Sequence, residues 1–152
     1  MSNALLTFVP RDRTYVPTPA AREQAVRLLR SFAPAGDDVA DTATEEIRFI
    51  DCRGNWSGVR CPACGRDAEP WFFDAVSEAY ERSGFRELSL AAPCCGAGVS
   101  LDALDFGWPV AFARYDLTAR NPWLESEVFP EPQLRELEEA VGCPLRVIWR
   151  RY

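Results

Sequence analysis

The chain has 152 residues, of which 47% are hydrophobic, and this is enough for one domain with an ordinary buried core. It contains no histidine and its 17 basic residues are all arginine, so a catalytic triad, a lysine Schiff base and a Walker-type phosphate loop each lack an essential residue. The formal net charge of −6 disfavours general binding of nucleic acid.

Residues 1–45 fall into three segments. We expect residues 1–17 to form an arm that adds an edge strand at 5–9. Residues 18–33 predict an amphipathic helix, because Thr18 can cap it, Pro19 suits its first position, and apolar residues recur along one face. The acid-rich residues 34–45 predict a solvated linker.

Residues 46–152 predict a regular core. We expect strands at 47–52, 85–91, 110–118 and 145–150, helices at 71–83 and 131–141, and a short helix at 100–104 within a loop. This β-α-β-β-α-β order favours a ferredoxin-like α+β fold, with one antiparallel sheet and both helices on one face. The N-terminal helix would pack outside it, and the whole chain would form a single domain.

A cysteine knuckle lies between the first core strand and its helix, at Cys61-Pro62-Ala63-Cys64-Gly65. Two intervening residues let both thiolates reach one tetrahedral ion, proline stiffens the turn, and glycine accepts a positive φ. The helix begins well after the second cysteine, and this disfavours a redox centre at a helix N-terminus.

A second element, Pro93-Cys94-Cys95-Gly96, follows the second core strand. Parallel strands of a β-α-β unit end at the same sheet edge, so the fold would bring the two elements together. We therefore predict a structural Zn²⁺ site, with iron as an open alternative. Its ligands would be Cys61, Cys64, Cys94 and Cys95.

One question about the identity of the ligands stays open. Cys94 and Cys95 are adjacent, so only one of them would ligate if the backbone cannot turn both toward the ion, and Cys52 would then be the reserve ligand. Cys143 is expected to be a buried free thiol. Because the chain shows neither a basic leader nor an apolar run of about 18 residues, we expect reduced cysteines, a cytoplasmic location and no membrane contact.

The first knuckle resembles those of zinc-ribbon and rubredoxin-type proteins. The second element, together with Trp108-Pro109 and Phe112-Ala113-Arg114, resembles a group of uncharacterised small bacterial proteins. The first resemblance implies metal binding by cysteine, and the second implies no activity.

Strand alternation predicts that several arginines project from the sheet face opposite the helices. One interpretation is a solvated face paired to Glu87 and Asp116, and the other is a surface that binds a partner. The residues of this candidate surface are Arg48, Phe112, Arg114, Arg146 and Arg150.

Five tryptophans are many for this length, and they either pack internally or leave Trp56, Trp108 or Trp123 exposed as an interface anchor. We therefore expect a non-enzymatic protein-interaction module with structural zinc, whose oligomeric state the sequence leaves open. The alternatives are a nucleic-acid-binding accessory that uses the arginine face and a thiol redox enzyme that uses Cys61 and Cys64.

Overall fold

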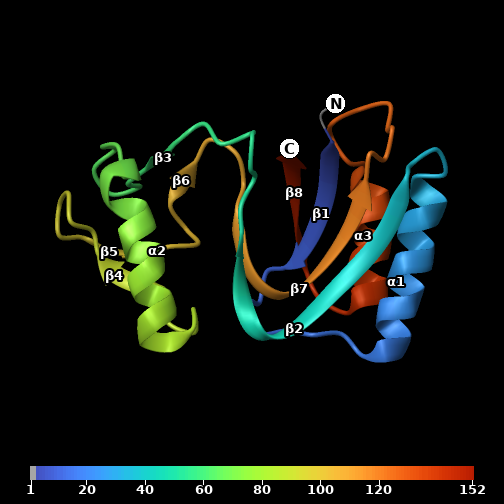
Figure 1. Ribbon diagram of the computed structural model, residues 1–152, viewed down its shortest axis with the longest axis horizontal. Coiled ribbons are helices and arrows are strands. Elements are labelled where there is room, and N and C mark those ends of the chain that lie inside the picture. The colour runs from blue at the N-terminus through green and yellow to red at the C-terminus, as the bar shows by residue number, and fades with distance from the viewer. Residues whose placement is uncertain (1–2) are drawn as a thin grey trace.

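The computed structural model describes residues 3–152, and within them it has three helices and a four-stranded antiparallel sheet (Figure 1). No helix in this part of the chain is long and apolar enough to cross a membrane. The elements in chain order are β1 Ala4–Pro10, α1 Pro19–Phe32, β2 Asp38–Ile50, β3 Val59–Arg60, α2 Glu69–Ser83, β4 Ser89–Ala91, β5 Gly98–Ser100, β6 Asp105–Phe106, β7 Ala111–Arg120, α3 Glu131–Val141 and β8 Leu145–Arg151.

The large sheet has the strand order β2-β7-β1-β8, and every neighbouring pair is antiparallel. Helices α1 and α3 cover one face of it, whereas residues 51–110 form a separate body against the other side (Figure 1). We call residues 51–110 the cysteine lobe. It contains α2 and two small two-stranded sheets, β3-β6 and β4-β5.

Strand β1 lies in the interior of the sheet, between β7 and β8, and the expectation of an edge strand was wrong. Its run of apolar residues explains this position. Leu6 and Phe8 enter the core under the helices, while Thr7 and Val9 are fully buried on the other face. An edge strand would not bury both of its faces.

Helix α1 begins as predicted, because the Thr18 side chain accepts a hydrogen bond from the N–H of Ala21 and Pro19 opens the helix. It buries Ala25 and Leu29 against the sheet. Helix α1 is thus one of the two helices that cover the sheet, and the prediction that it packs outside the fold was wrong.

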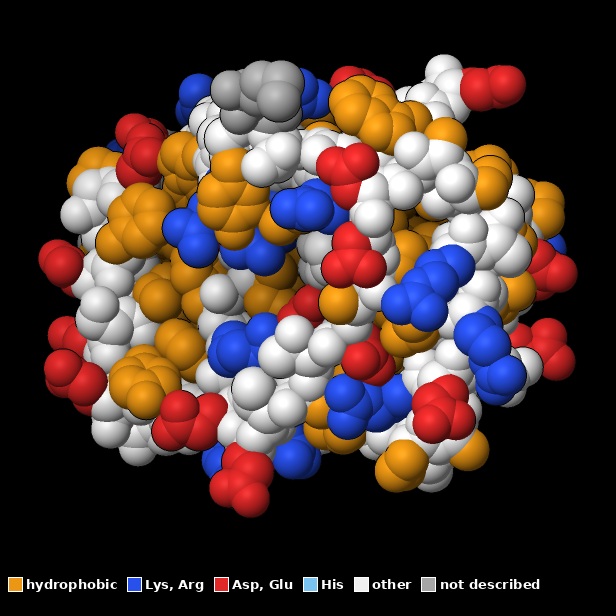
Figure 2. Space-filling model, turned by 45° about the vertical axis from the view of Figure 1, so that its right-hand side comes forward, with side chains coloured by type: hydrophobic (Ala, Val, Ile, Leu, Met, Phe, Trp, Pro, Cys, Tyr) orange, Lys and Arg blue, Asp and Glu red, His pale blue; other side chains and the backbone are white. Residues whose placement is uncertain are grey.

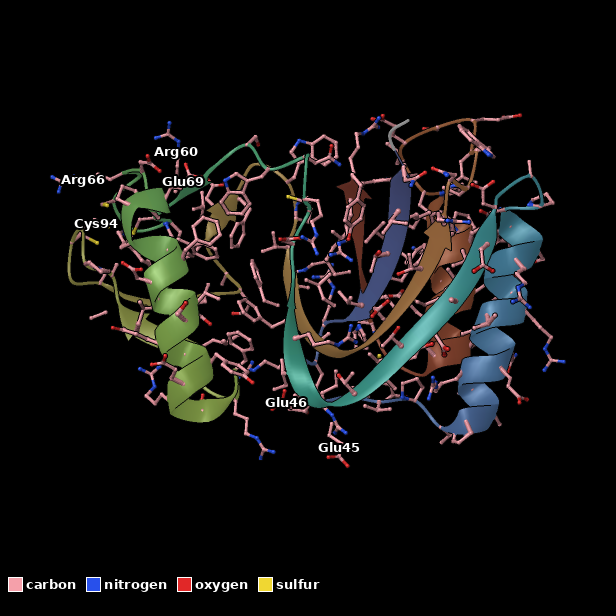
Figure 3. The ribbon with its side chains drawn as sticks, in the orientation of Figure 1. Glu45, Glu46, Arg60, Arg66, Glu69 and Cys94 are labelled. Carbon is pink, nitrogen blue, oxygen red and sulfur yellow. The ribbon has the colours of Figure 1, made fainter. Side chains whose placement is uncertain are left out.

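The acidic segment expected to be a linker is a strand from Asp38 onward. Among the strands of residues 3–152, β2 has only β7 as a neighbour, so acidic side chains along it can remain in water. A register shift between Ala43 and Arg48 bends the strand, and Figure 3 shows Glu45 and Glu46 at this bend. Because β2 is an edge strand with few apolar residues, hydrophobic periodicity did not predict it.

The predicted strand pairing was also wrong for the middle of the chain. Helix α2 closely matches its expected range, but it buries Phe72, Ala75 and Ala79 within the cysteine lobe and does not cover the large sheet. Strand β4 pairs with β5. Residues 101–104 form turns, and the short helix expected there is absent.

Two aromatic side chains from the large sheet extend into the core of the cysteine lobe. Phe49 on β2 and Phe112 on β7 have ring centroids 5.0 Å apart, and Phe112 lies 5.0 Å from Phe85 of the lobe. Side chains of the two long strands, β2 and β7, therefore pack the lobe against the large sheet. Helix α3 and strand β8 agree with their predicted positions.

Candidate metal centre

The first knuckle is a tight turn that follows β3. The N–H of Gly65 donates to the carbonyl of Cys61 at 2.8 Å, and the N–H of Cys61 donates to the carbonyl of Arg66 at 2.9 Å. Gly65 has φ of 74°, which a residue with a Cβ adopts only at a cost. This turn brings Cys61 and Cys64 to the same side of the loop.

The second knuckle has the same turn, which begins at Ala92, two residues before Cys94. The N–H of Gly96 donates to the carbonyl of Ala92 at 2.7 Å, the N–H of Ala92 donates to the carbonyl of Ala97 at 2.8 Å, and Gly96 has φ of 76°. Residues 61–65, Cys-Pro-Ala-Cys-Gly, therefore correspond to residues 92–96, Ala-Pro-Cys-Cys-Gly. Ala92 takes the place of Cys61, and Cys95 takes the place of Cys64.

All four candidate ligands converge at the end of the cysteine lobe, where Figure 3 shows Cys94. Their Sγ atoms lie within 4.8 Å of one another; Cys64 and Cys94 are 3.4 Å apart, and Cys61 and Cys95 are 3.8 Å apart. With Zn–S bonds of about 2.3 Å, tetrahedral geometry requires S···S separations of about 3.8 Å. The four thiols thus fit a tetrahedral ion, and both adjacent cysteines belong to the cluster.

The thiols in this cluster differ in their acidity. The pKa of Cys61 is lowered to about 7, mainly by a hydrogen bond from the backbone N–H of Cys64 and further by that of Ala63, against the opposing effect of burial. Burial, followed by hydrogen bonds within the cluster, raises the pKa of Cys94 to about 12. Four thiolates this close repel one another, and a divalent cation is the group that offsets this repulsion.

Two arginine side chains donate hydrogen bonds to backbone carbonyls of the knuckles. Arg66 donates to the carbonyl of Cys94 at 3.1 Å and so links the first knuckle to the second, while Arg60 donates to the carbonyl of Gly65 at 3.1 Å. Both lie at the same end of the lobe as Cys94 (Figure 3). Their positive charges suit an ion with four thiolates, which carries net negative charge.

The other two cysteines lie outside the cluster. Cys52, the expected reserve ligand, is fully buried among Val9, Val110 and Ile148, and burial raises its pKa. Cys143 is half-buried, and burial raises its pKa to about 11. Both positions favour neutral thiols that pack as small apolar side chains.

The residues of the candidate arginine surface make contacts inside the protein. At the bend of β2, Arg48 donates to Asp116 at 2.8 Å and to the hydroxyl of Thr44 at 3.0 Å, while Arg114 donates to the carbonyl of Thr44 at 2.9 Å. These contacts supply partners for backbone and side-chain groups where the ladder is interrupted. Asp116 is one of the acidic partners that the sequence suggested.

The other members of this set tie the sheet to the cysteine lobe. Arg146 donates to the carbonyl of Val110 at 2.8 Å, and Arg150 donates to the carbonyl of Asp51 at 2.7 Å. Asp51 and Val110 are the first and last residues of the lobe. Phe112 is only 3% exposed. These side chains thus hold the two ends of the lobe against the sheet.

Three tryptophans gather at the opposite end of the sheet from the bend of β2. Trp108, Trp123 and Trp149 line one cavity of about 330 Å³, and Trp123 is 68% exposed. The sequence identified Trp108 and Trp123 as interface candidates, but it gave no sign that Trp149 joins them. Trp149 reaches this place because β8 pairs with β1 and because its indole N–H donates to the carbonyl of Glu127 in the loop after β7.

No protein-family model, curated protein or solved structure matches this chain.

Proposed function

We propose that this protein is a protein-binding module whose cysteine lobe is held together by one structural zinc ion. The convergence of the four Sγ atoms of Cys61, Cys64, Cys94 and Cys95 within 4.8 Å carries this proposal. When all four ligands are sulfur, no coordination position remains for water or substrate, so the ion would stabilise the fold and would not catalyse.

The knuckles support a zinc-ribbon interpretation of the lobe. Each follows a short strand and closes with a glycine of positive φ, and the two turns share one hydrogen-bond pattern. For the rest of the chain we propose a ferredoxin-like unit, with the lobe inserted between its second and third strands. The order β2-β7-β1-β8, with α1 and α3 on one face, supports it.

A metal ion would supply stability that the small core of the cysteine lobe does not provide. Its strands have two or three residues each, and its single helix buries only Phe72, Ala75 and Ala79. Small bodies of this kind commonly depend on a metal ion, because binding free energy becomes folding free energy. Zinc ligation also requires reduced thiols, and we propose a cytoplasmic location on this ground.

The exposed tryptophan supports binding of another protein. Tryptophan is enriched among residues that dominate binding energy, and Trp123 presents most of its surface to water. The arginines that the sequence offered as the alternative surface use their donors on internal groups. We therefore place the binding surface at the tryptophans.

Nucleic-acid binding has less support. Figure 2 shows acidic and basic side chains interspersed over the face in view, and the net charge is −6. A nucleic-acid surface would instead gather free arginines, which phosphate contacts require.

The test is affinity capture from the source cell in mild salt, with nuclease treatment, using wild type, Trp123→Ala and the matched exposed-aromatic control Tyr80→Ala. We expect one stoichiometric protein that wild type and Tyr80→Ala retain and Trp123→Ala loses. Capture that nuclease abolishes would support the nucleic-acid alternative. Capture of no protein by wild type would contradict the binding function.

A thiol redox enzyme is the remaining alternative, and metal analysis separates it from a structural site. In the absence of an ion, Cys64 and Cys94 are close enough to form a disulfide when an oxidant such as a disulfide substrate accepts two electrons and two protons from their thiols. A metal-free native protein with a rapidly reacting Cys61 would favour redox chemistry over the proposal.

A further inference from the structure

The cavity lined by the three tryptophans lies where several distant parts of the chain meet. It receives residues from β1, from both connections of the cysteine lobe, from the loop after β7 and from β8. Figure 1 shows that loop beside the ends of β1 and β8. Ligand sites favour such junctions. The cavity lining includes Ala4, Asn55, Trp108, Trp123, Trp149 and Arg151.

The loop after β7 holds Trp123 in an unusual backbone conformation. Asn121 has φ of 44° and Trp123 has φ of 51°, both in the left-handed region that favours glycine. Asn121 is fixed there, because its side chain accepts from the N–H of Ala4 at 2.9 Å and donates to Asp37 at 2.8 Å. Strain of this kind tends to be retained at functional positions, and here it presents an exposed indole.

The three indole rings that line the cavity differ in their hydrogen bonds. The indole N–H of Trp149 donates to the carbonyl of Glu127 at 2.6 Å, which fixes both the ring and the loop. Within residues 3–152, neither Trp108 nor Trp123 donates its indole N–H to a protein acceptor. A ring that enters the cavity would meet indole faces together with N–H groups that can bind acceptors.

Arginine side chains lie in and beside the cavity. Arg151 lines it, 3.9 Å from Glu127, and its neighbours Arg53 and Arg150 lie over the ring of Tyr152. Asp51 is the shared partner of Arg53 and Arg150. The side chains of Arg53 and Arg151 are each 51% exposed and each forms one long ion pair, at 3.3 Å and 3.9 Å, so both keep N–H groups that can bind an acidic ligand. Their positive charge complements an acidic ligand.

We propose that the tryptophan cavity binds an aromatic side chain from an acidic segment of the partner protein. The inference rests on the proposed binding function and adds the chemistry of the partner. A volume of about 330 Å³ is at the lower end for ligand pockets, so it suits a single ring system. The arginines then contact carboxylates that flank the ring.

The test uses the full-length zinc-loaded protein and the synthetic peptide Glu-Asp-Phe-Asp-Glu with blocked ends, followed through the indole N–H resonances of the tryptophans. We expect shifts at Trp108 and Trp123. Replacing the peptide's phenylalanine with alanine, or using the variant Trp123→Ala, should weaken binding about tenfold or more. Arg151→Gln should weaken it and flatten its dependence on salt, whereas Tyr80→Ala should leave it unchanged.

Three results would overturn the proposal. They are an absence of shifts at Trp108 and Trp123 at millimolar peptide, equal binding of a peptide with lysine in place of the acidic residues, and equal binding by Trp123→Ala. Trp123 is largely exposed, so its removal should leave the fold intact, and retained zinc content checks this. If Trp123→Ala loses the captured protein but the acidic peptide does not bind, the partner chemistry is wrong and the binding function stands.

Discussion

Ala92 occupies in the second knuckle the place that Cys61 occupies in the first. Each accepts a hydrogen bond from the glycine four residues later and donates its own N–H to the carbonyl of the residue after that glycine. Both are buried, with 1% of their surface exposed. The second knuckle therefore has no cysteine at its first ligand position, and Cys94, which corresponds to Ala63, supplies the fourth sulfur.

This correspondence makes a prediction about relocating a ligand. Cys94→Ala should lose zinc affinity by more than the about 10–100-fold that loss of an outer-shell partner typically costs, because it removes a ligand. Adding Ala92→Cys to the Cys94→Ala variant should recover much of the affinity, because residue 92 occupies in the second knuckle the position that Cys61 occupies in the first. The measurement is competition for zinc with a chromogenic chelator.

Cys143→Ala is the matched control for this pair and should keep wild-type affinity, since Cys143 lies outside the cluster. Failure of Ala92→Cys to restore any affinity would mean that the two turns are not equivalent in the folded protein.

Removal of the metal should loosen one part of the chain selectively. Chelation takes the ion from the cysteine lobe, whose core is separate from the core beneath α1 and α3. Amide hydrogen exchange should accelerate by more than about tenfold in α2 and β4, while β1 and β7 remain protected. Uniform acceleration across both regions would contradict a local structural role for the ion.

Asp41 should make a pH-dependent contribution to the stability of the fold. Burial alone would raise its pKa, but hydrogen bonds from Arg22 and Tyr115 lower the pKa below its usual value. Its contribution is therefore present above the unfolded-state pKa and is lost as pH falls through the lowered folded-state pKa. Asp41→Asn should cost about 1–2 kcal/mol at pH 7, because the ion pair is partly exposed.

Urea unfolding of wild type and Asp41→Asn, measured at pH 7 and at pH 3, checks this sign. The difference between the two proteins should shrink at the lower pH. A constant difference would show that Asp41 acts through packing and not through its charge.

Arg146 should act on the fold and not on the partner. It is half-buried and donates to the carbonyl of Val110, so Arg146→Met leaves this carbonyl without its partner. We expect a loss of about 1–3 kcal/mol in the free energy of unfolding. Arg135→Met is the control, because Arg135 forms an exposed pair with Glu131 on α3, and it should change stability by less than about 0.5 kcal/mol.

Binding of the acidic peptide by Arg146→Met should equal that of wild type. A stable Arg146→Met protein that no longer binds a partner would indicate that the arginine residues, and not the tryptophans, form the binding surface.

Local signals in the sequence predicted several elements well. Thr18 and Pro19 marked the start of α1, and the bounds of α3 agree because glycine closes an amphipathic repeat. The knuckle at Cys61 was recognised for the same reason, since its proline and glycine act within a few residues. Such signals do not depend on the rest of the fold.

The pairing of strands could not be predicted in the same way. Strand β1 lies next to β8, at the other end of the chain, and β2 stays acidic because it is an edge. A consistent β-α-β-β-α-β order was found, but α2 and β4 were assigned to the sheet in place of β1 and α1. Helix α2 has an apolar face in either arrangement, so periodicity alone does not say which surface it covers.

The metal cluster was predicted from an incorrect pairing of strands. The expected convergence relied on parallel strands that end at one sheet edge, whereas the knuckles are carried by β3 and by β4, which belong to different small sheets. The match between residues 61–65 and residues 92–96 is visible in the sequence, and it is the signal that gives the position of both adjacent cysteines.

The most direct test of the zinc site is metal analysis with thiol titration, on protein purified without added metal. We expect about one zinc per chain and four thiols, at Cys61, Cys64, Cys94 and Cys95, that react only after chelation. Folded protein that contains no metal, with these thiols reacting at once or with a Cys64–Cys94 disulfide, would contradict the structural zinc site.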